Sequence, residues 1–148
     1  MQNMTKQDYK KYIDKKTPNS TLGKDIFFAF LFGGAICIIG QLIADGLRMT
    51  ALDAETVSST TSIIMVFLGA FLTGIGVYDR IAKVAGAGTI VPITGFANSV
   101  VSPAMEFKSE GLVLGLAAKM FVIAGPVLVY GILSSVLVGI IYFIMSLF

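Results

Sequence analysis

The chemistry open to this chain is limited by the residues it lacks. The sequence has no histidine and a single cysteine, Cys37, which lies inside an apolar run. Without histidine the commonest general base and metal ligand is missing, and one cysteine cannot form an intrachain disulfide. Ser99 or Cys37 would need a base that the sequence does not supply to act as a nucleophile. We therefore expect a protein that is not an enzyme and that has no cofactor and no metal site.

The most informative charged residue is Lys119, which lies well inside the apolar run that starts at Gly111. An ionisable side chain at membrane depth costs about 2.5 kcal/mol or more, so it faces a bundle interior or a cavity, or its amine reaches the interface. Two interpretations stay open. Lys119 contacts an anionic solute, or it snorkels to the interface or pairs with Glu106 or Glu110.

Hydroxyl and amide side chains gather in residues 84–102, where glycine and proline interrupt the apolar sequence. Interrupted helices in transporters place half-helix ends near the bilayer midplane, where helix N-termini face anions and freed carbonyls face cations. The segment could therefore line a wet path; a kinked structural helix packed inside an oligomer is the alternative. The expected helix breaks are at Gly86, Gly88, Pro92, Gly95 and, further along, Pro126. The candidate solute pathway consists of Lys119, Thr89, Thr94, Asn98, Ser99 and Ser102.

A third group of candidate residues consists of charged side chains next to the apolar segments. They are Asp79, Arg80, Lys83, Glu106, Lys108 and Glu110. The carboxylates could attract Ca²⁺, which prefers oxygen ligands, but their spacing follows no EF-hand pattern. As ion pairs at the membrane interface these residues need no further function.

The composition places these residues in a membrane protein. Of 148 residues, 55% are hydrophobic and 14% charged, whereas a soluble domain has roughly 45–50% apolar and about 25% charged residues. So few charges cannot cover a water-exposed exterior, so lipid must solvate much of the surface. The net charge of +2 argues against a nucleic-acid partner, because most of the lysines crowd the first 25 residues instead of forming a patch.

Residues 1–25 form a basic tail, either a short juxtamembrane helix carrying Tyr9, Tyr12 and Ile13 or a disordered arm. Its excess of lysine over the loop after the first span predicts a cytoplasmic N-terminus. Thr21 and the residues before it offer oxygens to cap a helix beginning near Leu22.

The membrane domain is expected to cover residues 26–148. Residues 26–44 and 62–78 are uncharged and long enough to cross the roughly 30 Å hydrocarbon core. The polar residues 45–61 connect them. Residues 81–105 carry too many glycines and prolines for one plain span, which favours a re-entrant or broken-helix pair.

Residues 111–148 are too long for one span. As a single helix these residues would measure about 57 Å, so we expect the chain to fold back or break. One division is a short or oblique helix over 111–125, a turn at Gly125-Pro126 and a span over 127–148. The other is two spans that meet around Tyr130-Gly131. The expected fold is an all-α integral membrane protein with about four transmembrane helices and a re-entrant or broken segment.

Several stretches of the sequence have a familiar pattern. They are Gly74–Arg80, Ala85–Gly88, Val91–Ser99, Glu106–Gly111 and Ala124–Pro126. Over residues 22–148 the chain resembles the AC type of the SpoVAC/SpoVAEB sporulation membrane proteins of spore-forming bacteria. The sister AE type has a similar glycine-rich Val-Pro core, but residues 97–99 and 106–111 favour the AC type.

The resemblance implies a component of the machinery that moves dipicolinic acid, as its Ca²⁺ chelate, across the inner, forespore-derived membrane of a spore during sporulation and germination. It implies a membrane channel, proposed to respond to tension, that works as a homo-oligomer or with other SpoVA-type membrane subunits and a soluble SpoVA-type partner. Dipicolinate is a small aromatic dianion that Lys119 and the polar groups near Thr94 could contact. A non-conducting membrane scaffold that docks partners of the same complex is the alternative.

Overall fold

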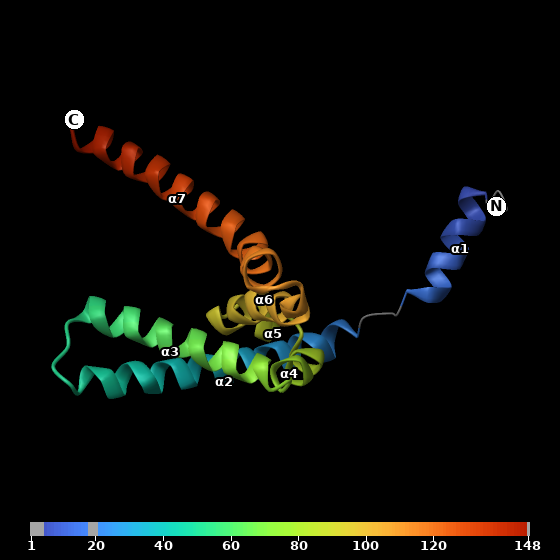
Figure 1. The fold of residues 1–148 in the computed structure, drawn as a ribbon, viewed down its shortest axis with the longest axis horizontal. Helices are drawn as coiled ribbons and strands as arrows, with labels where there is room; N and C mark the ends of the chain where they lie inside the picture. The colour runs from blue at the N-terminus through green and yellow to red at the C-terminus, as the bar shows by residue number, and fades with distance from the viewer. Residues whose placement is uncertain (1–4, 18–20, 148) are drawn as a thin grey trace.

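A computed structural model describes residues 5–17 and 21–147 of the chain (Figure 1). All regular structure in these residues is helical, which confirms the predicted fold class. The helices are α1 (Lys6–Lys16), α2 (Leu22–Arg48), α3 (Ala54–Gly74), α4 (Tyr78–Ala85), α5 (Ala87–Ile90), α6 (Ile93–Glu106) and α7 (Ala118–Ser146). A 3₁₀ turn, η1 (Lys108–Glu110), and a π-helical segment, η2 (Leu112–Ala117), connect α6 to α7.

Helices α2 and α3 form a long antiparallel hairpin, and each is long and apolar enough to cross a membrane. Both extend into residues 45–61, which the sequence predicted as a loop. Helix α3 begins early because the Asp53 side chain accepts hydrogen bonds from the backbone N–H and the hydroxyl of Thr56. The Thr61 and Ser62 hydroxyls donate to carbonyls one turn back, so these two polar side chains are satisfied within the helix.

Helix α3 ends at Gly74, not at residue 78 as expected, and Tyr78 opens α4 instead. From there the chain turns back into the helix bundle. Gly86, between α4 and α5, has φ +51°, a conformation that side chains with a Cβ rarely adopt. Gly88 in α5 lies so close to the backbone of Ala29 in α2 that a Cβ would collide with it. Helices α4 and α5 therefore run inward along the first half of α2.

Helix α6 brings the chain out again, in the same direction as α3. Gly69 faces Thr94, and four residues further along both helices the Thr73 hydroxyl donates to Asn98 Oδ1. The reversal between inward and outward segments lies at residues 91–92, beside Gly34 and Cys37 near the middle of α2. Residues 78–106 thus form a re-entrant hairpin that enters and leaves at one end of the bundle, in agreement with the expected re-entrant or broken-helix pair.

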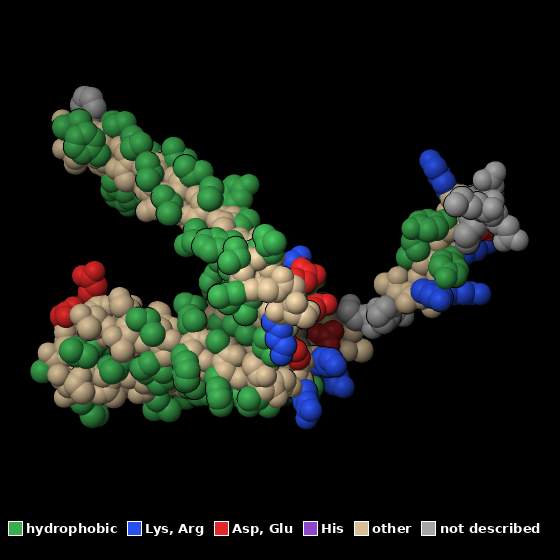
Figure 2. All heavy atoms as spheres, viewed as in Figure 1, with side chains coloured by type: hydrophobic (Ala, Val, Ile, Leu, Met, Phe, Trp, Pro, Cys, Tyr) green, Lys and Arg blue, Asp and Glu red, His purple; other side chains and the backbone are tan. Residues whose placement is uncertain are grey.

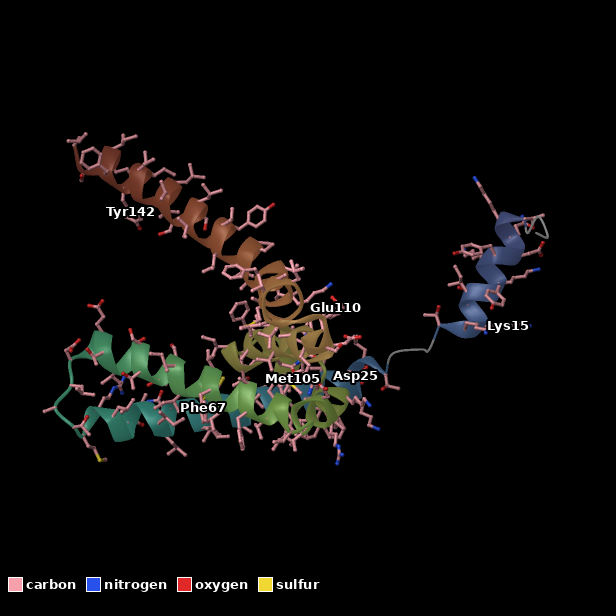
Figure 3. All side chains as sticks on the ribbon, viewed as in Figure 1. Lys15, Asp25, Phe67, Met105, Glu110 and Tyr142 are labelled. Carbon is pink, nitrogen blue, oxygen red and sulfur yellow. The ribbon has the colours of Figure 1, made fainter. Side chains whose placement is uncertain are left out.

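Charged side chains gather at the ends of the bundle (Figure 2). The acidic residues of the α2–α3 connection lie at one end. The opposite end, which we call the charged end, holds the start of α2, helix α4 and the turn after α6. Asp25, Met105 and Glu110 mark this end in Figure 3. The distribution fits a bundle with a water-exposed surface at both ends and lipid-exposed helices between them.

The expected turn at Gly125-Pro126 is wrong. Residues 112–146 form one continuous run of helix with Pro126 inside it, so the described residues contain three helices of spanning length where we expected about four. Gly125 lowers the cost of Pro126 inside this helix, because a residue without Cβ avoids part of the clash that a following proline causes. The alternative break at Tyr130-Gly131 is also absent. Figure 1 shows the helix nearly end-on where it leaves α6 and from the side further along, so its axis bends early instead of folding back.

Candidate functional site

The re-entrant hairpin is held together by a buried cluster around the Tyr78 hydroxyl. This hydroxyl lies 2.8 Å from the Thr89 carbonyl, to which it donates, and 3.0 Å from the Thr94 hydroxyl. The Thr89 hydroxyl donates to the Gly86 carbonyl. Thr89 and Thr94 are 1% and 5% exposed. Tyr78 therefore connects the inward segment of the hairpin to the outward segment.

A second polar contact fixes α6 to α3. The Thr73 hydroxyl oxygen lies 2.7 Å from the Gly69 carbonyl oxygen of its own helix and 2.9 Å from Asn98 Oδ1, and its single proton is shared between these two acceptors. The helices approach closely at this point, because a Cβ on Gly69 would lie 2.7 Å from the Thr94 carbonyl oxygen. Buried polar groups in an apolar bundle need partners. The five side chains of the two contacts, Tyr78, Thr89, Thr94, Thr73 and Asn98, supply them to each other and to the backbone.

The tip of the hairpin exposes the start of α6. Val91 is 85% exposed, and Pro92 is the N-cap residue, with no side-chain hydrogen bond to the first turn. The Gly95 N–H donates to the Pro92 carbonyl. The N–H groups at a helix start that lack such a partner carry the positive end of the helix dipole, which favours anions. Gly95 in this first turn packs against the backbone of Thr89 and Ile90, where a Cβ would collide. The arrangement places an uncapped helix N-terminus near half depth in the bundle.

The structure divides the predicted pathway residues between different places. Thr89, Thr94 and Asn98 are engaged in the two polar contacts just described, while Ser99 donates to the Phe96 carbonyl of its own helix. Ser102 is exposed on α6. The residues are therefore not gathered along one open channel in a single copy of the chain.

Lys119 lies apart from the other predicted pathway residues. Its Nζ is 3.8 Å from the centroid of the Phe107 ring, which follows the last residue of α6. The fourteen residues of α6 span about 21 Å, so Lys119 and Thr94 are at opposite ends of this helix. The lysine side chain points back toward the start of its own helix, the usual direction in an α-helix, and its amine reaches the charged end.

The predicted interfacial charges all lie at the charged end and are exposed. The ion pairs that we expected between them do not form in the described part of the chain, where the salt bridge found is Arg48–Asp45 in the distant half of α2. Nor do three or more carboxylate or cysteine side chains come together as a possible metal site within residues 5–17 and 21–147. Exposed ion pairs are worth little, so solvent competes successfully with them.

An apolar cavity of about 430 Å³ lies between α2, α3 and α4. Phe32, Ile36, Leu68 and Leu72 are among its lining residues, and Tyr78 closes one side. A carboxylate dianion would lose its hydration there without gaining partners. The cavity therefore does not suit an anionic solute.

Sequence reasoning missed Tyr78 and Thr73 as organising residues. Both residues were assigned to the expected span over residues 62–78. A usable signal existed in the spacing of Gly69 and Thr73, which places a small residue and a hydroxyl one turn apart on one helix face.

The comparisons with known proteins decide the family. The pattern of the SpoVAC/SpoVAEB sporulation membrane protein family matches residues 25–141. The chain belongs to this family. Stage V sporulation protein AC of Bacillus subtilis (strain 168) is 43% identical over 139 residues, which cover 93% of each chain. No solved structure matches.

Membership of the SpoVAC/SpoVAEB family confirms the resemblance found in the sequence, and the relative from Bacillus subtilis supports the AC type. It also confirms that the protein is a membrane protein with a role in sporulation. The match begins at residue 25 and so includes the α2–α3 hairpin and the whole re-entrant hairpin, while α1 lies outside it.

Proposed function

We propose that this SpoVAC-type protein is the membrane subunit of a conduit for dipicolinic acid, carried as its Ca²⁺ chelate across the inner membrane of the spore, with the N-terminus cytoplasmic. The single observation that carries the proposal is the uncapped N-terminus of α6 near half depth in the bundle. Half-helix N-termini at this depth bind anionic substrate groups in transporters. Free dipicolinate is a planar dianion that suits such donors, and the uncharged 1:1 Ca²⁺ chelate still presents carboxylate oxygens that accept hydrogen bonds from them.

The conduit requires more than one subunit. No residue of α7 is buried in a single copy, and the tip residue Val91 is exposed. A homo-oligomer, or a complex with other SpoVA-type membrane subunits, would enclose the tips of several hairpins around one path. A soluble SpoVA-type partner would dock at the charged end.

The hydrogen bonds of Tyr78 and Thr73 correspond to a closed state in this proposal. The hydroxyls in the broken segment satisfy one another and line no water path. Opening would separate α6 from α3 and expose Thr94 and Asn98 to solute. Because lateral separation of helices enlarges the membrane area of the complex, membrane tension would favour the open state.

Flux through vesicles tests this function. Vesicles carrying the assembled protein and loaded with dipicolinate should release it to terbium ions outside, which become luminescent on binding. Val91→Glu adds a negative charge at the tip and should lower release about tenfold or more, because like charges brought together cost several kcal/mol. Val91→Gln has nearly the same shape without the charge and should preserve release.

Lys119 is examined in the same assay. Lys119→Met should reduce anion flux if the amine attracts solute at the charged end, and Lys119→Arg should preserve it. Unchanged flux in Lys119→Met would show that Lys119 does not act on the solute and only anchors α7. Absence of release from vesicles that contain the protein with its membrane partners would reject the conduit.

A scaffold without conduction is the second candidate, and the exposed, unpaired charges of the charged end favour it. In that case Lys83→Glu with Lys108→Glu should abolish binding of a soluble partner of the complex. Val91→Glu should then leave dipicolinate transport by the whole complex unchanged. This pair of results would assign conduction to another subunit.

A further inference from the structure

Helix α1 has an aromatic and apolar face that nothing in the structure covers. Tyr9, Tyr12 and Ile13 occupy positions i, i+3 and i+4, which lie on one side of a helix. Their exposed fractions are 58%, 50% and 39%. The helix is well defined at its start, because the Thr5 side chain accepts a hydrogen bond from the backbone N–H of Asp8. An exposed helix face made of tyrosine and isoleucine favours contact with another surface that would cover these side chains.

The rest of α1 is strongly basic. Five lysines against two aspartates give the helix a charge of +3. The Lys16 amine lies 5.4 Å from the centroid of the Tyr12 ring, so even the apolar face is flanked by a cation. Figures 2 and 3 show lysine side chains, Lys15 among them, extending from α1. Tyrosine and lysine side by side are typical of the headgroup level of a bilayer.

The covalent chain keeps α1 close to the membrane. Lys16 and Leu22 are separated by five residues, so at most about 20 Å of chain joins α1 to a helix of spanning length. With eleven residues, α1 is about 16 Å long and too short to cross the membrane. Clusters of four to eight lysines beside a spanning helix are recognised by anionic lipid, with about a fivefold gain in binding for each lysine.

We propose that α1 docks on the anionic lipid surface of the membrane in which the protein is embedded. Tyr9, Tyr12 and Ile13 face the boundary between headgroups and acyl chains, and the lysines contact lipid phosphates. A nucleic acid would satisfy the lysines but leave the aromatic face in water. The proposal does not depend on conduction, so it can fail or succeed separately from the proposed function.

The chain has no tryptophan, so Tyr12→Trp supplies a single fluorescent reporter. The full-length variant is reconstituted in vesicles of phosphatidylcholine, alone or mixed with phosphatidylglycerol, with brominated acyl chains as quencher. A quencher within the bilayer reports docking whichever way the protein inserts. We expect stronger quenching and a blue-shifted emission with phosphatidylglycerol, both weakened by salt. Equal quenching in the two lipids, or none in either, would overturn the proposal; none in either would favour a protein partner.

Charge removal provides a second, matched test. Lys10→Gln with Lys11→Gln should weaken docking about 25-fold, from about fivefold for each lysine. Lys83→Gln with Lys108→Gln removes the same charge from the chain outside α1 and should leave docking unchanged. If the two double variants behave alike, the lysines of α1 have no specific role and the proposal fails.

Discussion

At the scale of single residues, one hydroxyl joins segments that would otherwise be free to separate. Tyr78 is 4% exposed, and its oxygen contacts Thr89 on the inward segment and Thr94 on the outward segment. A buried carbonyl that loses its donor costs more than a hydrogen bond contributes, since water cannot replace the partner. The cluster therefore stabilises the observed arrangement of the re-entrant hairpin.

Tyr78→Phe should lower the free energy of unfolding by about 1–3 kcal/mol, because it leaves the Thr89 carbonyl without this donor. Thermal unfolding in detergent measures the effect. Tyr130→Phe is the matched control. Tyr130 is 75% exposed on α7, so loss of its hydroxyl should change the stability little. Equal unfolding temperatures for the two variants would show that the cluster contributes no stability.

At the scale of elements, the start of α3 depends on one carboxylate. The hydroxyl and the backbone N–H of Thr56 donate to Asp53 and hold the pKa of this carboxyl below its ordinary value. The charged form also interacts favourably with the positive end of α3. Ionised Asp53 thus fixes the point at which the chain re-enters the helix after the α2–α3 connection.

The lowered pKa of Asp53 predicts a pH dependence of stability. Its contribution should be complete above the ordinary aspartate pKa of about 3.9 and disappear as the pH falls through the lower folded-state pKa. Asp53→Asn keeps a side-chain acceptor at the N-cap but does not titrate. The stability difference between the native chain and Asp53→Asn should therefore shrink on acidification, as measured by thermal unfolding across this pH range. A constant difference would contradict the assignment.

Local chemistry made some elements predictable and others not. The uncharged residues 26–44 indicated α2, and the glycines and Pro92 indicated the broken segment. The polar residues 54–61 were wrongly assigned to a loop, because hydroxyls that bond back to their own helix cannot be distinguished by composition from hydroxyls exposed in a turn. Pro126 was wrongly assigned to a turn, since its cost is offset within a long apolar helix.

At the scale of the whole molecule, the pairing of α3 with α6 could not be predicted from the sequence. Thr73 and Asn98 are 25 residues apart, and nothing local indicates that they meet. The position of Lys119 over Phe107 likewise depends on how η1 and η2 return the chain beside the end of α6. The candidate residues could be found in the sequence by their type. Which of them lie together in space could be learned only from the fold.

Helix α7 has a long surface still available to a partner. It buries no residue in one copy, and Gly131, Ser135 and Gly139 recur every four residues along it. In an oligomer such a ridge permits close helix contact. Ser135→Leu should therefore lower the oligomeric mass in detergent, measured by light scattering. Ser134→Leu, on another face of the same helix, should not; identical masses for both would place the contact elsewhere.

The depth of the hairpin tip has an electrical consequence. Residues 91–92 lie beside the middle of α2, so about half of a transmembrane voltage falls between either surface and the tip. One elementary charge moved across the full voltage changes in energy by about 2.3 kcal/mol per 100 mV, and a dianion moved halfway changes by the same amount. Occupancy of the tip by free dipicolinate, a dianion, would therefore vary nearly fiftyfold over 100 mV, with opposite sign for anions arriving from the two sides. The uncharged 1:1 Ca²⁺ chelate would not respond to the voltage.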